Sequence, residues 1–421
     1  MKSEVSSAAC DAAAEVSQDR LWQRLMDLAA IGARPDGGVC RHALSDEDIE
    51  ARALVIGWAR ARGYDVSVDE AANLWVRRPG TDANAEPVIA GSHMDSQPAG
   101  GKFDGAYGVL AAFEALEAMD GAGIKTRRPV DMVAWTNEEG GRFDRGCTGS
   151  SAWSGAVPLE DYLDDIGVDG VRLGDALRAT LAATPDLPRR PPGFAAHAYV
   201  EPHIEQGPVL ETSNVPVAAV TSIQGVRWMN VELFGTAGHA GTTPHAIRRD
   251  AYQAAHRAIS LLNGLMDDPG DVVRFTVGRV NIEPNSPNTI PERVLFSIDF
   301  RHPDKALLDE KCRAIEVLVA EAAGPCSFKI TPTTSMDPTP FPQDLVERIE
   351  ASATALGHDC LQLASGAFHD ALYAARKCPS VMIFIPCRGG LSHHPDEWAE
   401  PVHCAIGAKV LTATLVDLAN G

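Results

Sequence analysis

The sequence lacks any Cys-x-x-Cys pair, and its nine cysteines are scattered along 421 residues. This pattern excludes a zinc site built from paired thiolates and argues against a disulfide framework, so it predicts a reducing compartment. The N-terminus lacks the apolar core of a signal peptide, and no apolar run approaches the roughly 20 residues of a membrane-spanning helix. We therefore expect a cytoplasmic protein that does not enter a membrane.

Basic residues are also scarce. The chain has 37 Lys and Arg against 57 Asp and Glu, a formal net charge of −20. Because such a surface repels phosphate groups, nucleic acids and anionic membranes are not expected as partners. The apolar fraction of 45% is typical of a globular protein. A chain of this length exceeds the usual size of one hydrophobic core, so two domains are expected.

The first half of the chain alternates short apolar segments with helical patterns. Strands are predicted at 87–90, 130–135 and 198–204, and helices at 46–62 and 105–119. This β–α–β alternation predicts an α/β fold with a mostly parallel sheet.

The pattern changes after residue 221. Strands at 226–234, 272–280, 294–300 and 327–331 alternate with helices at 246–262 and 305–322. The resulting order, β–α–β–β–α–β, predicts a ferredoxin-like α+β module. The proline-rich segment 332–341 is interpreted as a return linker. We therefore predict a catalytic domain of residues 1–222 and 335–421, interrupted by an inserted lid domain of residues 223–334.

Five polar motifs stand at predicted strand ends or beside glycine: GSHMD (91–95), GGKFDG (100–105), TNEEGG (136–141), HIEQG (203–207) and SHHPDE (392–397). Strand ends of an open α/β sheet line its ligand crevice. Each motif alone also has a structural interpretation, such as a helix cap at Asp104 or a solvated glutamate pair. Together they supply nitrogen and oxygen donors that favour Zn²⁺ or a similar ion such as Mn²⁺.

Two further roles follow from the residue types in these motifs. Of two adjacent glutamates, one can bind metal while the other takes a proton from the attacking water. Asp95, two residues after His93, is predicted to accept the second ring N–H of that histidine and to fix its tautomer.

These motifs, with GTAGHAGTTP at 235–244, occur in an order that resembles the hydantoinase/carbamoylase family of amidases. That family includes N-carbamoyl-L-amino acid hydrolases, allantoate amidohydrolases and some β-ureidopropionases, within the two-metal aminoacylase/carboxypeptidase superfamily. The resemblance covers essentially the whole chain. HIEQG distinguishes this branch from the peptidases, which carry a carboxylate at the position of His203.

The resemblance implies two divalent metal ions per subunit, Zn²⁺ in the first place, with Mn²⁺, Co²⁺ or Ni²⁺ as alternatives. The implied ligands are Asp104 between the ions, His93 and His203 on one ion, and Glu139 and His393 on the other. His393 is preferred to His394 because it directly follows Ser392.

The resemblance also assigns roles in catalysis and substrate binding. Glu138 is the expected general base, and His239 the expected donor to the oxyanion. The expected substrate-binding residues are Asn288 and Arg301 on a carboxylate, Gln206 on the ureido group, and His369. For Gln206, a purely structural role that braces its turn stays open. The implied assembly is a homodimer formed through the lid domain, in which His239 reaches the partner's site.

The implied reaction is cleavage of the carbamoyl (ureido) C–N bond of an N-carbamoyl amino acid or related ureido acid, by a metal-bridged hydroxide. Two alternatives stay open: an aminoacylase or dipeptidase acting on N-acyl amino acids, and an inactive metal-binding scaffold. His245 and Phe368 depart from the residues usual in the family, Met and Gly, and Phe368 is expected to narrow or reshape the pocket and so to affect the choice of substrate.

Overall fold

The computed structural model describes residues 5–421; the first four residues of the predicted catalytic domain lie outside this range. The chain forms two compact units, Met1–Thr221 with Phe341–Gly421, and Ser222–Pro340. The predicted insert, 223–334, is contained in the second unit.

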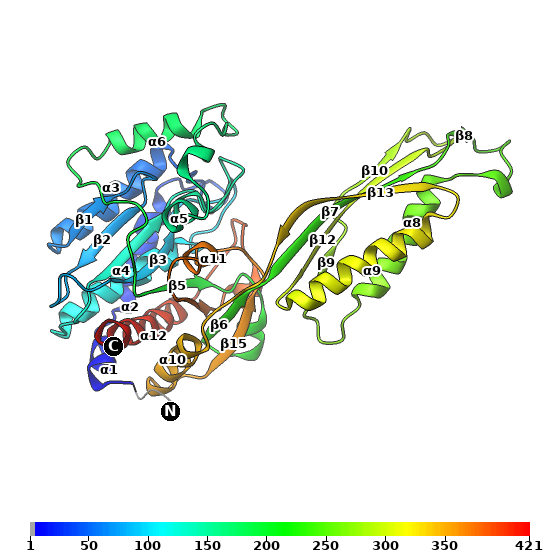
Figure 1. Ribbon diagram of the computed structural model, residues 1–421. Helices are drawn as coiled ribbons and strands as arrows, with labels where there is room; N and C mark the ends of the chain where they lie inside the picture. The colour runs from blue at the N-terminus through cyan, green and yellow to red at the C-terminus, as the bar shows by residue number, and fades with distance from the viewer. Residues whose placement is uncertain (1–4) are drawn as a thin grey trace. The chain divides into compact units, whose positions relative to one another are not determined.

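The first unit is built around a nine-stranded sheet (Figure 1). Its order is β1 (Asp65–Val68), β2 (Leu74–Arg78), β4 (Val130–Trp135), β3 (Val88–His93), β5 (Ala198–Ile204), β16 (Ser380–Ile385), β6 (Val217–Ile223) and β14 (Thr339–Pro340), with β15 (Cys360–Ser365) beside β6. β14 and the last two residues of β6 fall within Ser222–Pro340, the range of the second unit. The four central strands, β4, β3, β5 and β16, are parallel, whereas antiparallel strands form the flanks. The central strands are buried along their whole length, as strands covered on both faces must be. The predicted α/β fold is confirmed.

Helices surround this sheet. They are α1 (Ser7–Ala14), α2 (Gln18–Ala30), α3 (Asp46–Ala61), α4 (Ala106–Gly121), α5 (Thr148–Ser154), α6 (Leu173–Ala182), α7 (Val209–Ser213), α10 (Gln343–Ala355), α11 (Ala371–Ala374) and α12 (Pro401–Asn420). α4 packs on β3 and β5, and α12 packs on α4, β5 and β16. Against the expectation that no apolar run approaches membrane-spanning length, α12 has the length and hydropathy to cross a membrane. However, 72% of its apolar window is buried inside the unit, which is what a core helix shows.

Two buried carboxylates join α4 to its neighbours. Glu117 is 2% exposed and forms ion pairs with Arg24 (2.5 Å) and Arg62 (2.6 Å). Glu114, fully buried, pairs with Arg20. A charge removed from water needs such partners, and these pairs connect α2 and the residue after α3 to α4.

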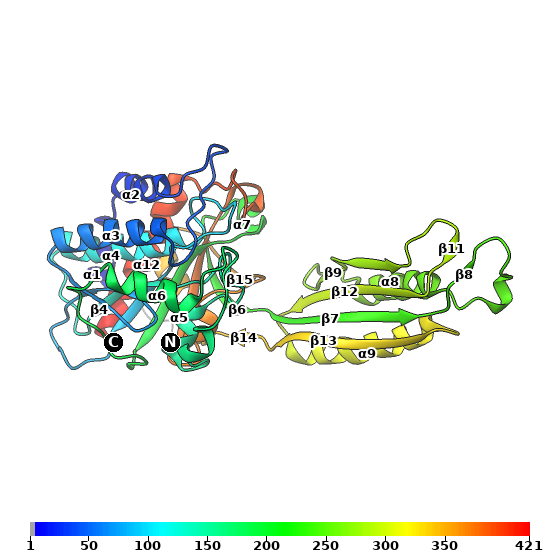
Figure 2. The same ribbon diagram turned by 90° about the horizontal axis from the view of Figure 1, so that it is seen from above.

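The second unit has a sheet of order β10 (Val280–Glu283), β12 (Arg293–His302), β7 (Gly225–Phe234) and β13 (Ser327–Met336), with β9 (Arg274–Thr276) also beside β12 (Figure 2). Helices α8 (Ala251–Met266) and α9 (Lys305–Ala323) pack on each other and on these strands. β8 (Gly238–His239) and β11 (Thr289–Ile290) form a separate two-stranded sheet. The ferredoxin-like prediction is confirmed.

Three predicted elements of this unit differ in detail. The helix predicted at 246–262 begins at Ala251, because the Asp250 side chain caps it by accepting two backbone N–H groups. The strand predicted at 272–280 is interrupted and forms both β9 and β10 along β12. The predicted linker 332–341 is largely strand: β13 continues to Met336, and its edge position tolerates Pro332 at a register shift.

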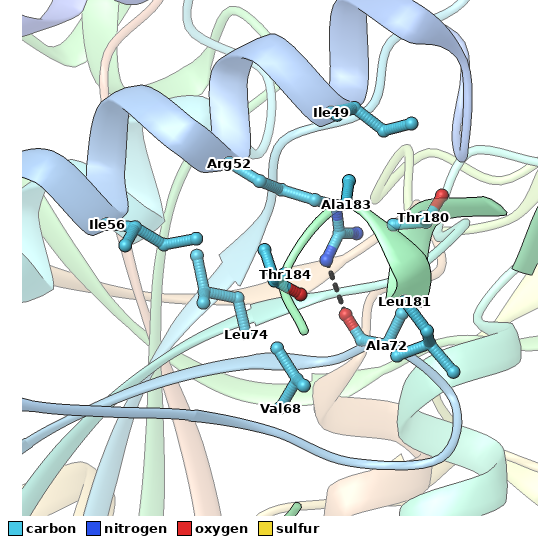
Figure 3. A pocket seen from close by; sticks show the side chains of 10 residues that line it. All are labelled: Ile49, Arg52, Ile56, Val68, Ala72, Leu74, Thr180, Leu181, Ala183 and Thr184. Atoms are coloured by element: carbon cyan, nitrogen blue, oxygen red, sulfur yellow. Dashed lines mark hydrogen bonds between the residues drawn. The ribbon is translucent and has the colours of Figure 1, made fainter. Parts of the chain in front are cut away.

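A small, mostly apolar pocket lies between α3 and α6 (Figure 3). It is lined by Ile49, Arg52, Ile56, Val68, Ala72, Leu74, Thr180, Leu181, Ala183 and Thr184. The Arg52 guanidinium donates to the Ala72 carbonyl and to the Thr136 hydroxyl (3.2 Å), and it pairs with Asp48 (2.9 Å). Because Thr136 begins the TNEEGG motif, this buried arginine braces the strand end that carries the glutamate pair.

Candidate metal centre

The predicted metal ligands gather at one edge of the first unit's sheet. The parallel strands β4, β3, β5 and β16 are neighbours, so their carboxyl ends meet. His93 ends β3, His203 lies near the end of β5, and Glu139 follows β4. His393 lies in the loop after β16, and Asp104 precedes α4.

Asp104 lies between two groups of side chains. Its Oδ1 is 3.1 Å from Nε2 of His203 and 3.7 Å from Nε2 of His93. Its Oδ2 is 3.4 Å from Nε2 of His393, which is 3.2 Å from Oε2 of Glu139. His93, Asp104 and His203 form one triad, and Asp104, Glu139 and His393 form the other. In each triad, one ligand atom from each residue lies within 4.8 Å of the other two. By contrast, the His394 ring faces Asp396, at 3.8 Å.

The imidazole tautomers suit a cation. Nδ1 of His93 lies 2.9 Å from the backbone carbonyl of Asp95, and Nδ1 of His203 lies 2.9 Å from that of Ile204. A carbonyl oxygen can only accept, so both rings carry a proton on Nδ1 and turn Nε2 to the side of Asp104, where it would coordinate a cation once any proton on it has been released. This is the ring orientation of histidine ligands.

The electrostatics of the centre also favour positive charge. Hydrogen bonds to Asp104 and Glu139 raise the pKa of His393 to about 11. Burial lowers the pKa of His203, but the hydrogen bond to Asp104 outweighs it and raises the pKa to about 9. The histidines in turn hold the pKa of Asp104 well below its usual range, against the effect of burial. A divalent cation, bound with release of these protons, fits this donor set.

Glu138 stands beside the ligands without joining either triad. Its Oε2 is 3.4 Å from Nε2 of His93, and its Oε1 is 3.5 Å from the Cys147 thiol. Burial, followed by the negative charges of Asp370 and Glu139, raises its pKa well above the usual range. A carboxylate that holds a proton readily at this position is suited to general acid–base work.

Asp95 acts differently from the prediction. Nδ1 of His93 lies 2.9 Å from the backbone carbonyl oxygen of Asp95, and the carboxylate Oδ1 stands further from the same nitrogen, at 3.7 Å. The carboxylate instead accepts the backbone N–H groups of Glu138 (3.2 Å) and Glu139 (3.1 Å). Asp95 therefore orients the loop that carries the glutamate pair.

Two other predicted residues lie against the ligands. The Gln206 amide donates from Nε2 to Oδ2 of Asp104 (2.8 Å) and to the Ser392 hydroxyl (3.1 Å). His369 is 1% exposed, packs edge-on against the His203 ring at 4.5 Å, and bonds the Ser365 hydroxyl through Nε2 (2.9 Å). In this structure both residues contact neighbouring protein side chains.

The remaining predicted residues, His239, Asn288 and Arg301, belong to the second unit. The backbone N–H of Ala240, next to His239, donates to the Asn288 carbonyl (3.0 Å). Arg301 lies near the end of β12 and bonds Asp299 (2.9 Å). The unit thus brings His239 and Asn288 together, but it does not bring Arg301 to them.

Glu397 and Ser392 belong to the centre but were not predicted. Glu397 accepts backbone N–H groups at Phe103 and Asp104, and Ser392 donates to Asp104. Both belong to the SHHPDE motif, and their closeness in the sequence to the proposed ligand His393 could have indicated their role. Nothing in the sequence indicated that Cys147 would contact Glu138.

Gly105 offers a test of the geometry. Its φ is +62°, and a Cβ there would lie 2.3 Å from the His93 ring. Gly105→Ala is therefore expected to displace His93 and to weaken metal binding by about 10–100-fold, the usual cost of disturbing a ligand's support. Gly123→Ala is the matched control, since its φ is +66° but no atom lies within 4 Å of the new Cβ. In Gly123→Ala, the free energy of unfolding should fall by only the roughly 1–2 kcal/mol that a left-handed conformation costs a residue with a side chain. Equal metal affinity of the two variants by titration would contradict the proposed role of His93.

Known proteins resemble this chain along most of its length. Residues 89–417 match the model of peptidase family M20/M25/M40. The chain is 39% identical to an N-carbamoyl-L-amino-acid amidohydrolase of Rhizobium meliloti, over 96% of this chain and 97% of that one. It is 36% identical to an allantoate amidohydrolase of Bacillus subtilis, over 93% and 95% of the two chains.

A solved amidase of the hydantoinase/carbamoylase family from Burkholderia multivorans superposes with a TM-score of 0.91 at 40% identity, covering 96% of this chain and 98% of that one. The relatives are hydrolases of linear amide C–N bonds, in a metal-dependent family. The chain therefore belongs to peptidase family M20/M25/M40 and, within it, to the hydantoinase/carbamoylase amidases, and it is an amidohydrolase.

Proposed function

We propose that this protein removes the carbamoyl group of an N-carbamoyl amino acid or a related ureido acid, with two divalent metal ions per subunit. The observation that carries the proposal is the position of Glu138 beside two ligand triads that share Asp104. The relatives named for N-carbamoyl amino acids and allantoate support the substrate class. Zn²⁺ is the first choice for these nitrogen and oxygen donors, with Mn²⁺, Co²⁺ or Ni²⁺ as alternatives, and the cytoplasm is the proposed location.

His93, His203 and Asp104 would hold one ion, and Asp104, Glu139 and His393 the other. When bound, such ions supply Lewis acidity and acidify a water molecule. Glu138 takes the proton of the attacking water and later delivers it to the leaving nitrogen. Asp95 holds Glu138 in place through the backbone N–H, and His239 donates a hydrogen bond to the developing oxyanion.

Gln206 supports a ureido substrate over an N-acyl substrate. A carboxylate only accepts hydrogen bonds, so the amide nitrogen of Gln206 must be the atom beside Asp104. Its Oε1 is consequently directed away, and this oxygen is buried without a hydrogen-bond partner. A buried acceptor without a donor is unfavourable, and the –NH₂ of a ureido group would supply that donor. The methyl group of an N-acetyl substrate would not.

The second unit supports a homodimer. Beyond the Arg293 end of β12 lie β8 and β11, which carry His239 and bring Asn288 beside it, whereas Arg301 is eight residues along the strand (Figure 2). At about 3.3 Å per residue, the two ends are roughly 25 Å apart. One copy of the unit cannot bring Asn288 and Arg301 to the same small carboxylate. We propose that one protomer supplies Arg301 and its partner supplies His239 and Asn288.

Mixing two inactive variants tests this arrangement. If His239 acts on the partner's site, a Glu138→Gln protomer paired with a His239→Ala protomer contains one intact site. Co-refolded mixtures are then expected to recover about one quarter of wild-type activity, from half-active hybrids that form half of the dimers under random pairing. Separately refolded variants serve as controls. A mixture no more active than its components would contradict action across the interface.

The reaction itself is tested by a substrate panel. Metal-loaded protein is incubated with N-carbamoyl amino acids, allantoate and β-ureidopropionate, and ammonia is measured. An N-acetyl amino acid is assayed alongside for free amine. Ammonia from a ureido compound, abolished by chelation, is the expected result. Cleavage of the N-acetyl compound alone would favour the aminoacylase alternative. If none of the compounds is cleaved, a non-catalytic scaffold would be favoured.

A further inference from the structure

Glu397 connects two segments that carry proposed ligands. Its side chain is buried, and the whole residue is 2% exposed. Oε1 accepts the backbone N–H of Phe103 (2.9 Å) and that of Asp104 (3.0 Å). The loop that contains His393 is thereby joined to the turn that presents Asp104. Two backbone hydrogen bonds to one carboxyl oxygen form this junction.

The second oxygen of Glu397 faces Ser392. The Ser392 hydroxyl is 3.1 Å from Oε2 of Glu397 and 2.8 Å from Oδ2 of Asp104, and it accepts from the Gln206 amide. A hydroxyl has a single proton to donate. If a cation takes Oδ2 of Asp104, Glu397 still offers this proton an acceptor. The Ser392 hydroxyl therefore keeps a hydrogen bond whether or not the metal is bound.

Close packing also holds Glu397 against the turn at Phe103 and Asp104 from two sides. A Cβ at Gly101 would lie 2.1 Å from the Glu397 carboxyl carbon, so the carboxylate occupies the space above this glycine. Next to it, the Trp398 ring meets the Phe103 ring edge-on at 5.7 Å. Glu397 has little room to adopt another position.

The two ligand triads depend on this junction to different degrees. His93 and His203 stand on buried strands, and each bonds a local backbone carbonyl. His393 stands on a loop, has a half-exposed side chain and has a φ of +54°. Its place opposite Asp104 therefore relies on what holds the loop.

We propose that Glu397 is a positioning residue for the second metal ion, the one between Asp104, Glu139 and His393. This inference rests on the proposed two-metal function. Glu397 aligns the shared ligand Asp104 with the His393 loop and adds negative charge near the ion. Loss of that support should weaken the second ion about 10–100-fold, as substitutions behind metal ligands usually do, and should affect the first ion less.

The test is metal titration of the apoprotein, prepared by chelation, with Zn²⁺ followed by calorimetry and by metal content after dialysis. Wild type is expected to hold two ions. Glu397→Gln preserves the shape but removes the charge, and it is expected to hold one ion tightly and the other about 10–100-fold more weakly. Ser392→Ala should also weaken binding of the second ion, by a smaller factor. This variant replaces Glu397→Gln in the test if Glu397→Gln does not fold.

Glu117→Gln is the matched control, since Glu117 is equally buried at 2% but pairs with arginines away from the centre. It should keep both affinities even if its melting temperature falls. Unchanged affinities in Glu397→Gln, equal weakening of both ions, or the same loss in Glu117→Gln would each overturn the positioning role. A wild-type protein that binds fewer than two ions would instead overturn the two-metal function.

Discussion

Glu138→Gln is expected to lower kcat by about 10²–10⁴-fold, the usual contribution of a general acid–base group, while both metal ions stay bound. Glutamine keeps the size of the side chain but cannot take up a proton from water. The ligand triads do not include Glu138, so metal content should be unchanged. The measurements are kcat on the best ureido substrate and metal content of the same preparation.

Glu160→Gln is a suitable control for this variant, because Glu160 is exposed and lies outside the centre. It should behave as wild type. A Glu138→Gln protein that turns over at the wild-type rate would show that another group accepts the proton. Loss of metal together with activity would show that Glu138 is a ligand.

Asp104→Ala should have a comparably large effect for a different reason. Asp104 is shared by both triads, so its removal takes one ligand from each ion. The Lewis acidity of bound metal stabilises a transition state by several kcal/mol. At 1.36 kcal/mol per tenfold change, activity should fall by more than about 10³-fold.

Stability provides a readout of this variant that does not need activity. Metal that binds only the folded protein adds about 4 kcal/mol at a free concentration 1,000 times Kd. Chelation should therefore lower the melting temperature of wild type and leave that of Asp104→Ala unchanged. Asp396→Ala is the control, since Asp396 is exposed beside His394 and should keep both ions. An Asp104→Ala protein whose melting temperature still responds to chelator would contradict the shared-ligand role.

Much of this centre could be predicted because its motifs are local and the strands are parallel. His93, Glu139 and His203 lie at the ends of strands that the apolar pattern places correctly. Parallel neighbouring strands must end at the same edge, so the side chains that end them meet without further information. The inserted unit was predictable for a similar reason, because alternating periodicities of two and 3.6 residues specify its element order.

The sequence alone did not show how the polar groups are shared among the segments. Asp95 meets the His93 ring through its carbonyl and leaves its carboxylate to the Glu138 loop, a choice that depends on backbone angles. Glu397 accepts the backbone N–H of Asp104, which lies 293 residues away in the sequence. The limits of β9, β10 and β13 likewise followed from pairing with β12 and β7.

The sequence by itself therefore determined the residue types of the centre, the sheet edge that carries them and the family to which they belong. The tertiary structure decided which acceptor each N–H and O–H group uses, and it placed Arg301 near the end of β12 that lies away from β8 and β11. The physical reason is that local periodicity reports which face of an element is buried. A hydrogen bond between distant segments instead depends on where both segments come to lie once the core has packed.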